Sequence, residues 1–344
     1  WTCSGAVMTV RVNKPAFNIR DKLSELERPI GVKGSELMKS KTTQEARDSI
    51  SAGRKNLIIN GDMRIAQRGT TSTVDNGYGC IDRWFKYSNG DTNTWGQATD
   101  AVHGTYAYWV AKSNGYGNLR QRIEPFFVPT NGINYVASFW MKISSGIAPL
   151  RYEIWNNTDQ TSISNDMQHD LLTTDWKKYT INFRLDSVDS MDNWHLLLGS
   201  NDAPGGVTFY LTKVQIEEGD TATEFEHRPI GEELTLCQRY YQRFDTSFRF
   251  INAYPEVGLS SGDQLPSFPF PVPMRTAPSM SPTTVTSTFD KWNATGLITR
   301  EVRANTASTH WNFQYFASDN GNTTLAADYH RGITTEAFAF SAEI

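Results

Sequence analysis

Residue types that could carry out catalysis are present, but their spacing matches no recognised catalytic set. The six histidines show neither H-x-x-x-H nor H-E-x-x-H spacing, which would place two zinc ligands on one helix face. No G-x-x-x-x-G-K-S/T phosphate loop occurs. Glu217 and Glu218 are adjacent, so on a strand they face opposite sides and cannot flank one glycosidic bond. We therefore expect a protein that is not an enzyme and that has neither a metal site nor a cofactor.

Tryptophans beside charged residues are the side chains best suited to bind a ligand. Strand alternation in YVASFWMKIS puts Trp140 and Lys142 on the face opposite to the apolar residues. In LRYEIW it does the same for Arg151, Glu153 and Trp155. An indole stacks on the apolar face of a sugar ring while charged groups hydrogen-bond its hydroxyls. We predict that Trp140, Arg151, Glu153 and Trp155 bind a glycan. The alternative is that these tryptophans pack under loops or against another subunit, and the two runs lie in one sheet or in opposite sheets.

The segment that carries these residues predicts an antiparallel β-sandwich. Between residues 56 and 230, short runs rich in β-branched and aromatic residues alternate with turn-forming clusters such as SNGD and NDAPGG. No helical stretch separates the eight runs, which are NLIING, DRWFKYS, TYAYWVAK, YVASFWMKIS, LRYEIWN, KKYTINFRL, NWHLLLGS and VTFYLTKVQI. This pattern favours a jelly roll, with one buried and one solvated face on each sheet. We predict that residues 56–230 form this domain.

The stretch EFEHRPIGEELTLCQRYYQRF, residues 224–244, predicts one charged helix after the sandwich. Arg239 and Arg243 fall in its last turn, as the helix dipole favours. An apolar face repeats at helical spacing and has to be buried between the two β-domains or against neighbouring chains. Its members are Leu234, Cys237, Tyr241 and Phe244. Gln242 falls off this face, so we expect substitutions there to be nearly silent.

A proline-rich passage and further alternating runs follow the helix. Prolines at the density of LPSFPFPVPMRTAPSMSPTTV exclude a central strand and favour an edge or extended course. The runs GLITREVRAN, HWNFQYFAS and AFAFSAEI alternate again. We predict that residues 231–344 comprise the bridging helix and a smaller C-terminal β-domain.

The N-terminal segment, residues 1–55, has helical patterns in place of the strand alternation seen in the rest of the chain. FNIRDKLSELER predicts a short helix with one narrow stripe, and TTQEARDSI has the spacing of a capping box. The stripe consists of Ile19, Leu23 and Leu26. A stripe this narrow suits either a self-associating seam of two or three chains or a solitary surface helix. We predict an attachment and stalk segment.

Composition excludes several classes of partner. The formal net charge is −4 and no basic run occurs, so nucleic acid is not an expected partner. No apolar run approaches the roughly 18 residues needed to cross a bilayer, and the N-terminus lacks the pattern of a signal peptide. Three scattered cysteines do not form a disulfide framework. We expect no membrane insertion and assembly in a reducing compartment.

The order of several motifs resembles the distal part of bacteriophage tail fibres, especially those of marine and environmental phages. These motifs are NLIINGDMRIAQRGT, DRWF, the segment from VQIEEGD to the predicted helix, and PVPMRTAPSM. The most specific is E-E-L-x-L-C-Q-R-Y-Y, and the resemblance covers roughly residues 56–344. It implies a carbohydrate-binding-module-like jelly roll, a bridging helix and a C-terminal β-domain.

The same resemblance implies a biological setting. The protein would be a homotrimeric fibre subunit that is assembled in the host cytoplasm and incorporated into the virion. Its N-terminal segment would bind a phage tail or adaptor protein, and its β-domains would bind host surface polysaccharide or lipopolysaccharide. Alternatives are a polysaccharide-degrading tailspike and a cellular carbohydrate-binding adhesin module. Related modules often hold calcium, but Met63 and Arg64 follow Asn60-Gly61-Asp62 where carboxylates would be expected.

Overall fold

The chain divides into two compact units, Trp1–Lys55 and Asn56–Ile344. The computed structural model describes residues 55–88, 94–110, 115–123, 133–156, 161–162, 171–185, 194–203, 205–244, 248–251, 259–260, 264–281, 285–291, 297–306, 310–315, 324–325, 329–334 and 338–343. The predicted N-terminal helices, with Ile19, Leu23 and Leu26, lie outside these residues.

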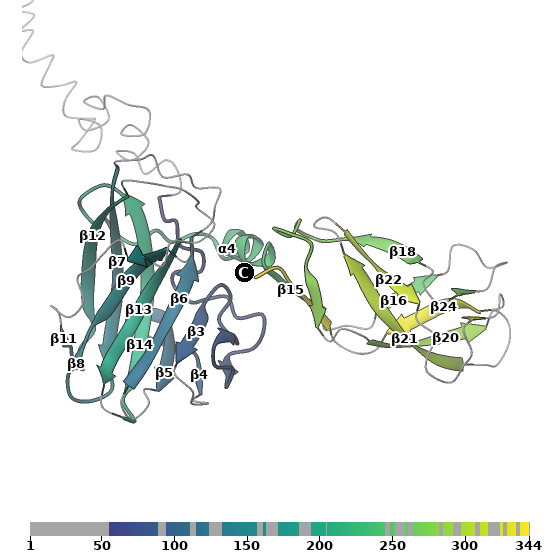
Figure 1. The fold of residues 1–344 in the computed structure, drawn as a ribbon, viewed down its shortest axis with the longest axis horizontal. Helices are drawn as coiled ribbons and strands as arrows, with labels where there is room; N and C mark the ends of the chain where they lie inside the picture. Colours follow the sequence, from purple (N-terminus) through teal and green to yellow (C-terminus); the bar gives the residue numbers. More distant parts are fainter. Residues whose placement is uncertain are drawn as a thin grey trace, which may run out of the picture. The chain divides into compact units, whose positions relative to one another are not determined.

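Two antiparallel sheets of six strands each form a sandwich within the described residues (Figure 1). Sheet A contains, in spatial order, β1 (Thr71–Ser72), β4 (Trp95–Asp100), β5 (Gly104–Val110), β14 (Thr208–Glu218), β7 (Ile133–Ile143) and β12 (Lys177–Leu185). Sheet B contains β10 (Thr161–Ser162), β9 (Arg151–Asn156), β13 (Trp194–Ala203), β6 (Gly115–Arg122), β3 (Phe85–Ser88) and β2 (Gly77–Tyr78). A short pair, β8 (Ala148–Pro149) and β11 (Leu171–Leu172), accompanies them. The predicted mainly-β sandwich is confirmed.

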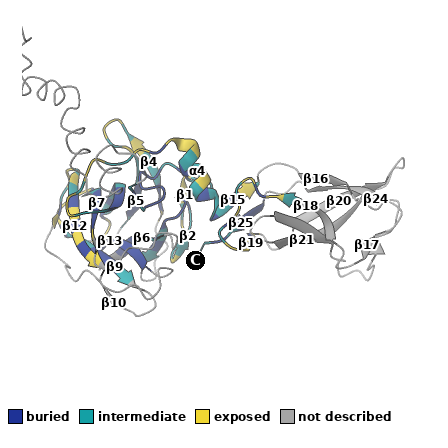
Figure 2. Ribbon diagram, turned by 90° about the horizontal axis from the view of Figure 1, so that it is seen from above, coloured by how far each residue is buried: buried dark blue, intermediate teal, exposed yellow. Residues whose placement is uncertain are grey.

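The core of the sandwich lies between the inner faces of the two sheets. On β7 the side chains of Ala137, Phe139 and Met141 have no exposed surface, as the alternation in the sequence predicted. Trp84 and Trp109 are also fully buried. Figure 2 shows this pattern as buried stretches along the strands of both sheets. The residues that alternate with these along each strand lie on the outer faces of the sheets. We therefore look for a ligand site on the outer faces.

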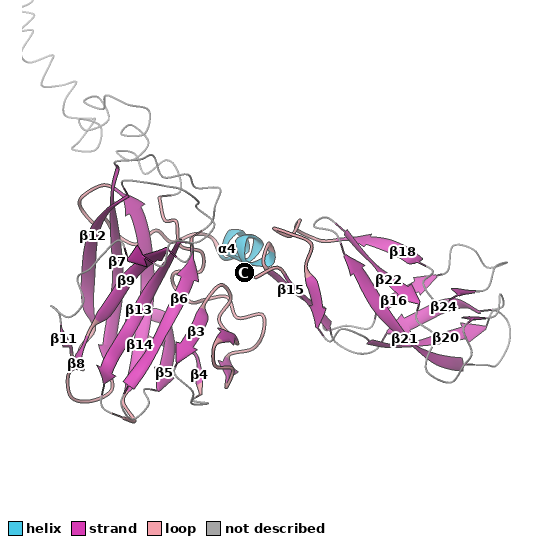
Figure 3. Cartoon of the chain, viewed as in Figure 1, coloured by secondary structure: helices cyan, strands magenta, loops and turns pink. Residues whose placement is uncertain are grey.

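Helix α4, Ile230–Gln238, is shorter than the sequence predicted (Figure 3). The chain leaves the helix after Gln238, and β15 (Tyr241–Phe244) pairs with β25 (Phe338–Ser341). Arg239 and Arg243 therefore do not form the last helical turn, which contains no basic residue. The prediction was wrong here because pairing with a strand about a hundred residues later outweighs a helical spacing that covers only one further turn.

The C-terminal part contains, among the described residues, antiparallel sheets of three, six and two strands. β25 lies between β15 and β19 (Ser279–Ser281). The other sheet has the order β16 (Phe248–Ile251), β24 (Tyr329–Thr334), β20 (Val285–Lys291), β21 (Leu297–Thr306), β22 (His310–Tyr315) and β18 (Gln264–Pro269), while β17 (Leu259–Ser260) pairs with β23 (Thr324–Leu325). The proline-bearing strand β18 is an edge strand with a register shift between Gln264 and Ser267. Its edge position agrees with the sequence prediction, because proline cannot donate a hydrogen bond to a second neighbour.

Candidate functional site

The residues predicted to bind a glycan lie on the outer faces of two different sheets. Trp140 lies on β7 of sheet A, whereas Arg151, Glu153 and Trp155 lie on β9 of sheet B. Each has the orientation predicted from alternation, opposite to residues of the core. The core separates the two groups, so the four residues form parts of two candidate sites instead of one.

The outer face of sheet A carries a group of aromatic rings that we call the aromatic face. It consists of His103, Tyr106, Trp140, Trp176 and Tyr210, with Lys142 beside them. The register of β14 places Tyr210 opposite Lys142 and Thr212 opposite Trp140 on β7. Because alternate residues share a face of the sheet, the strands themselves bring Tyr210, Lys142 and Trp140 together.

Two rings of the aromatic face come from loops. His103 belongs to the hairpin between β4 and β5, and Trp176 precedes β12. The His103 ring lies 5.2 Å from the Trp140 ring and 4.8 Å from the Trp176 ring, centroid to centroid. Trp176 lies 5.8 Å from Tyr106 and 6.4 Å from Tyr210. All these rings are partly exposed, so they form a continuous surface that keeps contact with solvent.

Burial lowers the pKa of the histidine in the aromatic face. The carboxylate of Asp100 raises the pKa of His103, whereas the ammonium groups of Lys213 and Lys142 lower it. Burial raises the pKa of Asp100, but hydrogen bonds from the backbone N–H groups of His103 and Val102 outweigh it and lower the pKa. The Lys142 Nζ lies 5.0 Å from the Trp176 ring centroid and 5.1 Å from that of Tyr210. The face thus offers stacking surfaces, an ammonium donor and a carboxylate acceptor.

The outer face of sheet B is polar and more buried. Arg151 Nη2 lies 2.8 Å from Glu153 Oε2, and Glu153 is only 5% exposed. His195 on β13 pairs in register with Trp155. Burial, reinforced by Arg120 and Arg122, lowers the pKa of His195 to about 3. The imidazole on this face is therefore neutral over the whole physiological range.

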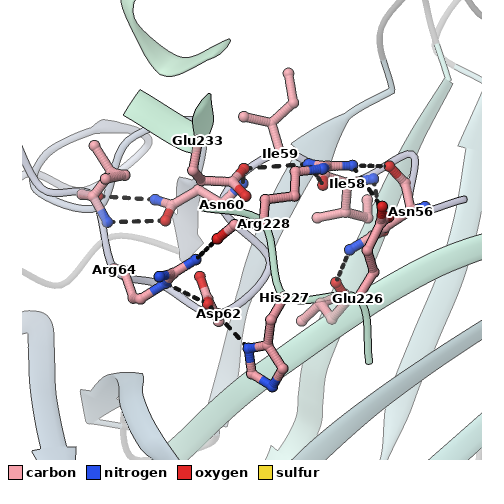
Figure 4. Close-up of polar contacts among 12 residues, drawn as sticks. Asn56, Ile58, Ile59, Asn60, Asp62, Arg64, Glu226, His227, Arg228 and Glu233 are labelled. Carbon is pink, nitrogen blue, oxygen red and sulfur yellow. Dashed lines mark hydrogen bonds and ion pairs between the residues drawn. The ribbon is translucent and has the colours of Figure 1, made fainter. Parts of the chain in front are cut away.

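The motif that begins NLIING and the segment that enters α4 contact each other (Figure 4). The backbone N–H of Asn60 donates to Glu233 Oε1 at 2.5 Å, and Arg228 Nη1 donates to Ile58 O at 3.0 Å. Arg228 Nη2 also donates to the carbonyl of Asn56. These side chains are nearly fully buried. The start of the jelly roll and the segment that enters α4 are therefore fixed to each other by buried, charge-assisted hydrogen bonds.

Backbone geometry explains the N-G-D sequence in the first of these motifs. Asn60 has a φ of 57°, in the left-handed region that Asn tolerates better than most residues. A Cβ added at Gly61 would lie 2.1 Å from the carbonyl oxygen of Val214, so only glycine fits. Asp62 forms an ion pair with Arg64 at 2.5 Å. The motif therefore has a structural role in the described contacts.

A second buried network joins the end of the chain to the jelly roll. Arg83 Nη1 lies 2.7 Å from Glu343 Oε2, and Arg68 Nη2 lies 3.5 Å from Glu343 Oε1. Burial raises the pKa of Asp82 to about 6, although Arg68 lowers it. The Arg83 guanidinium lies 3.4 Å from the centroid of the Tyr240 ring. The segments around β1 to β3, the turn after α4 and the residues that follow β25 are thus held in one cluster.

Four residues were predicted to form the buried face of the helix that follows the sandwich. In the structure, Leu234, Cys237, Tyr241 and Phe244 make their contacts from α4 and β15. Cys237 is fully buried in a cluster with Ile59, Ile65 and Tyr240, and Leu234 packs partly buried against it. The Tyr241 ring lies under Arg68, at 3.6 Å from the guanidinium carbon. Phe244 stacks on Phe338 at 5.3 Å. Tyr241 and Phe244 make these contacts from a strand and not from the predicted helix.

Gln242 does not behave as a surface residue. It is 2% exposed, and its Nε2 donates to Gln238 O at 3.0 Å and to Val272 O at 2.6 Å. Because Tyr241–Phe244 is a strand, the helical projection that put Gln242 on the solvent side does not apply. The expectation that substitutions there are nearly silent is therefore wrong.

Metal and catalytic groupings can be assessed for the described residues. Among them, no three His, Cys, Asp or Glu side chains gather where they could hold a metal ion. The sequence Gly258–Gly262 matches G-x-S-x-G, but its Leu259–Ser260 forms strand β17 and the next described element, β18, is also a strand. A nucleophile elbow requires a strand-to-helix turn. No helix in the described part of the chain has the length and apolar character to cross a bilayer.

Comparison with known proteins gives only partial likenesses. No family model and no curated protein matches the sequence. A CBM4 carbohydrate-binding module is 18% identical, with a TM-score of 0.34, over 46% of this chain and 98% of that one. A cyclase from Fischerella sp. TAU is 14% identical, with a TM-score of 0.37, over 50% of this chain and 100% of that one. The enzymatically active domain of tailspike protein 4 from bacteriophage CBA120 is 10% identical, with a TM-score of 0.33, over 48% of this chain and 21% of that one. At these scores the likeness carries no information on function.

Proposed function

We propose that this protein binds carbohydrate on the aromatic face of sheet A. The observation that carries the proposal is the outward group of His103, Tyr106, Trp140, Trp176 and Tyr210, whose ring centroids lie 4.8–6.4 Å from at least one neighbour. A pyranose ring presents C–H groups on its faces and hydroxyls at its edge. Aromatic rings bury the former, and nearby charged groups bind the latter.

We further propose that the protein is a tail fibre subunit that binds host surface polysaccharide or lipopolysaccharide for its phage. This step rests on the resemblance of the motifs around Asn60 and Glu233 to those of phage fibres. A homotrimer would present three copies of each face, and several fibres per virion would raise the effective concentration further. Weak individual sites then suffice for firm adsorption. The N-terminal segment would supply the stalk and the contact with the tail or an adaptor.

The proposal predicts a loss of glycan binding when the aromatic face is truncated. Trp140→Ala and Trp176→Ala should each weaken binding to an array of bacterial surface polysaccharides by about two- to tenfold, since aromatic contacts contribute roughly 0.5–1.5 kcal/mol. Trp140→Tyr, which keeps a ring, should retain most of the binding. Thr180→Ala, at an exposed position of the same sheet, is the matched control.

Circular dichroism and the mass of the assembled protein, measured on the same samples, separate binding from folding. If folded Trp140→Ala and Trp176→Ala proteins bind every polysaccharide as the parent does, the aromatic face is not the glycan site. If the parent protein has the mass of a single chain in solution, the trimeric fibre is wrong, whatever the array shows.

A further inference from the structure

The outer face of sheet B carries polar and charged residues from three neighbouring strands. Strands β9, β13 and β6 are neighbours, and the register aligns their outward residues in three rows. From β9 through β13 to β6, the rows are Trp155–His195–Arg122, Glu153–Leu197–Arg120 and Arg151–Gly199–Asn118. We call the six polar residues of these rows the polar face. They come from three strands, so the fold and not sequence proximity assembles them.

Two buried polar atoms on this face have no hydrogen-bond partner. His195 is 7% exposed and Asn118 is 1% exposed. The Nε2 of His195 and the Nδ2 of Asn118 form no hydrogen bond within the described structure. Burying such groups without partners costs stability, and folded proteins normally avoid it. Two of them lie on one face, between half-exposed arginines, where the acceptor groups of a ligand would complete their hydrogen bonding.

The chemistry of the face identifies the kind of ligand. Its charged groups are Arg120, Arg122, Arg151 and Glu153, and the carboxylate already pairs with Arg151 at 2.8 Å. Asn118 Oδ1 accepts a hydrogen bond from Arg120 Nε at 2.8 Å, which leaves the amide nitrogen as the group to be satisfied. The face therefore offers mostly donors and an excess of positive charge. Its complement is an anion with acceptor oxygens.

We propose that the polar face binds the acidic groups of an anionic polysaccharide, carboxylate or sulfate, as a second site separate from the aromatic face. Arg122 and Arg120 bind the anion, while Asn118 Nδ2 and the neutral His195 donate hydrogen bonds to it or to adjoining hydroxyls. Trp155, half-exposed at the end of one row, supplies a stacking surface for the ring. As in the proposed function, the ligand is a carbohydrate, but this second site lies on the opposite sheet.

The test measures binding of the full-length protein to three immobilised probes: polygalacturonate, dextran sulfate and neutral dextran. The parent protein should bind one or both anionic probes, less strongly as salt is raised, and should bind neutral dextran more weakly. Polygalacturonate and dextran sulfate distinguish carboxylate from sulfate as the recognised group. Arg122→Gln should weaken anionic binding by about tenfold. Arg184→Gln, which removes one positive charge from an exposed position of sheet A, should leave it unchanged.

Three results would overturn the proposal. They are absence of binding to both anionic probes, equal binding to neutral dextran, and equal weakening by Arg122→Gln and Arg184→Gln, which would indicate only non-specific charge attraction. Asn118→Asp provides a second variant, because it puts a negative charge beside the ligand and should weaken anionic binding more than Arg122→Gln does. Trp140→Ala should not affect binding to these probes. If the aromatic face proves not to bind glycan, binding of anionic probes to the polar face is unaffected. If the polar face does not bind these probes, the proposed glycan site on the aromatic face is likewise unaffected.

Discussion

His195 is a titratable residue whose protonation the fold suppresses. Its pKa is lowered to about 3 by burial and by Arg120 and Arg122, against an ordinary value of 6.5. As the pH falls from 6.5 toward 3, the unfolded chain takes up a proton that the folded chain does not. The free energy of unfolding should therefore decrease with falling pH in this window, by at most about 1.4 kcal/mol per pH unit from this residue.

His195→Gln should remove this contribution. Urea unfolding of the parent and the variant at about pH 7 and about pH 5 tests it: the free-energy difference between the two proteins should shift in favour of the variant at the lower pH. Other groups titrate in the same range, among them Asp82, but they are common to both proteins. If the two proteins lose stability in parallel, His195 is not held neutral in the folded state.

At the residue scale, alternation in the sequence predicted which face of the sheet each strand side chain lies on. It did not predict which residues of other strands and loops lie beside it. Trp140 faces outward and Phe139 inward because a strand's side chains alternate with a period of two. Whether β7 and β9 share a sheet depends on pairing between distant strands, which no local pattern records. His103 and Trp176 were not predicted because they lie in loops, and only the fold brings the His103 ring to Trp140 and the Trp176 ring to His103. Arg151 and Glu153 of the polar face were predicted from alternation on β9. The other four residues were not, because only strand pairing brings β13 and β6 beside β9.

At the scale of elements, the segment from α4 to β15 is where helical spacing gave the wrong structure. Glu232 and Glu233 lie in the first turn of α4, where the helix dipole favours acidic residues. After Gln238 the backbone pairs with β25, and Gln242 becomes a buried residue that bonds Gln238 and Val272. The tyrosines that continue the helical pattern also suit a strand, so only the partner strand decides between the two.

Gln242→Ala should therefore destabilise the protein by about 1–3 kcal/mol, because it leaves two partly buried carbonyl groups without their donor. Thr235→Ala, at an exposed position on α4, should change stability by no more than about 0.5 kcal/mol. The midpoint of chemical unfolding for each variant provides the comparison. Equal effects at the two positions would show that the strand assignment of Tyr241–Phe244 is wrong.

At the scale of the whole molecule, the two buried networks connect sequence-distant parts of the chain. Glu233 and Arg228 join the segment before α4 to the start of the jelly roll, and Glu343 joins the last described residues to Arg83. Two of the sequence motifs that resemble those of phage fibres belong to the first of these networks, and Arg83 of the DRWF motif belongs to the second. The described contacts of these motifs are therefore structural.

Glu343→Gln should destabilise the protein by about 3–5 kcal/mol, because it leaves the fully buried Arg83 guanidinium without a charged partner. Thermal unfolding measures the loss, and limited proteolysis should show earlier cleavage between the jelly roll and the C-terminal strands. The double variant Glu343→Gln with Arg83→Met should recover part of the stability. A single variant as stable as the parent would contradict the role of this ion pair.

Carbohydrate binding to the aromatic face can be followed directly through the indole N–H resonances of the tryptophans. The spectrum of isotope-labelled protein would be recorded while the polysaccharide fragment that binds best on the array is added, with assignments from single Trp-to-Phe variants. We expect the resonances of Trp140 and Trp176 to shift in a saturable manner, whereas those of the fully buried Trp84 and Trp109 do not. Saturable binding that leaves the Trp140 and Trp176 resonances unchanged would contradict it.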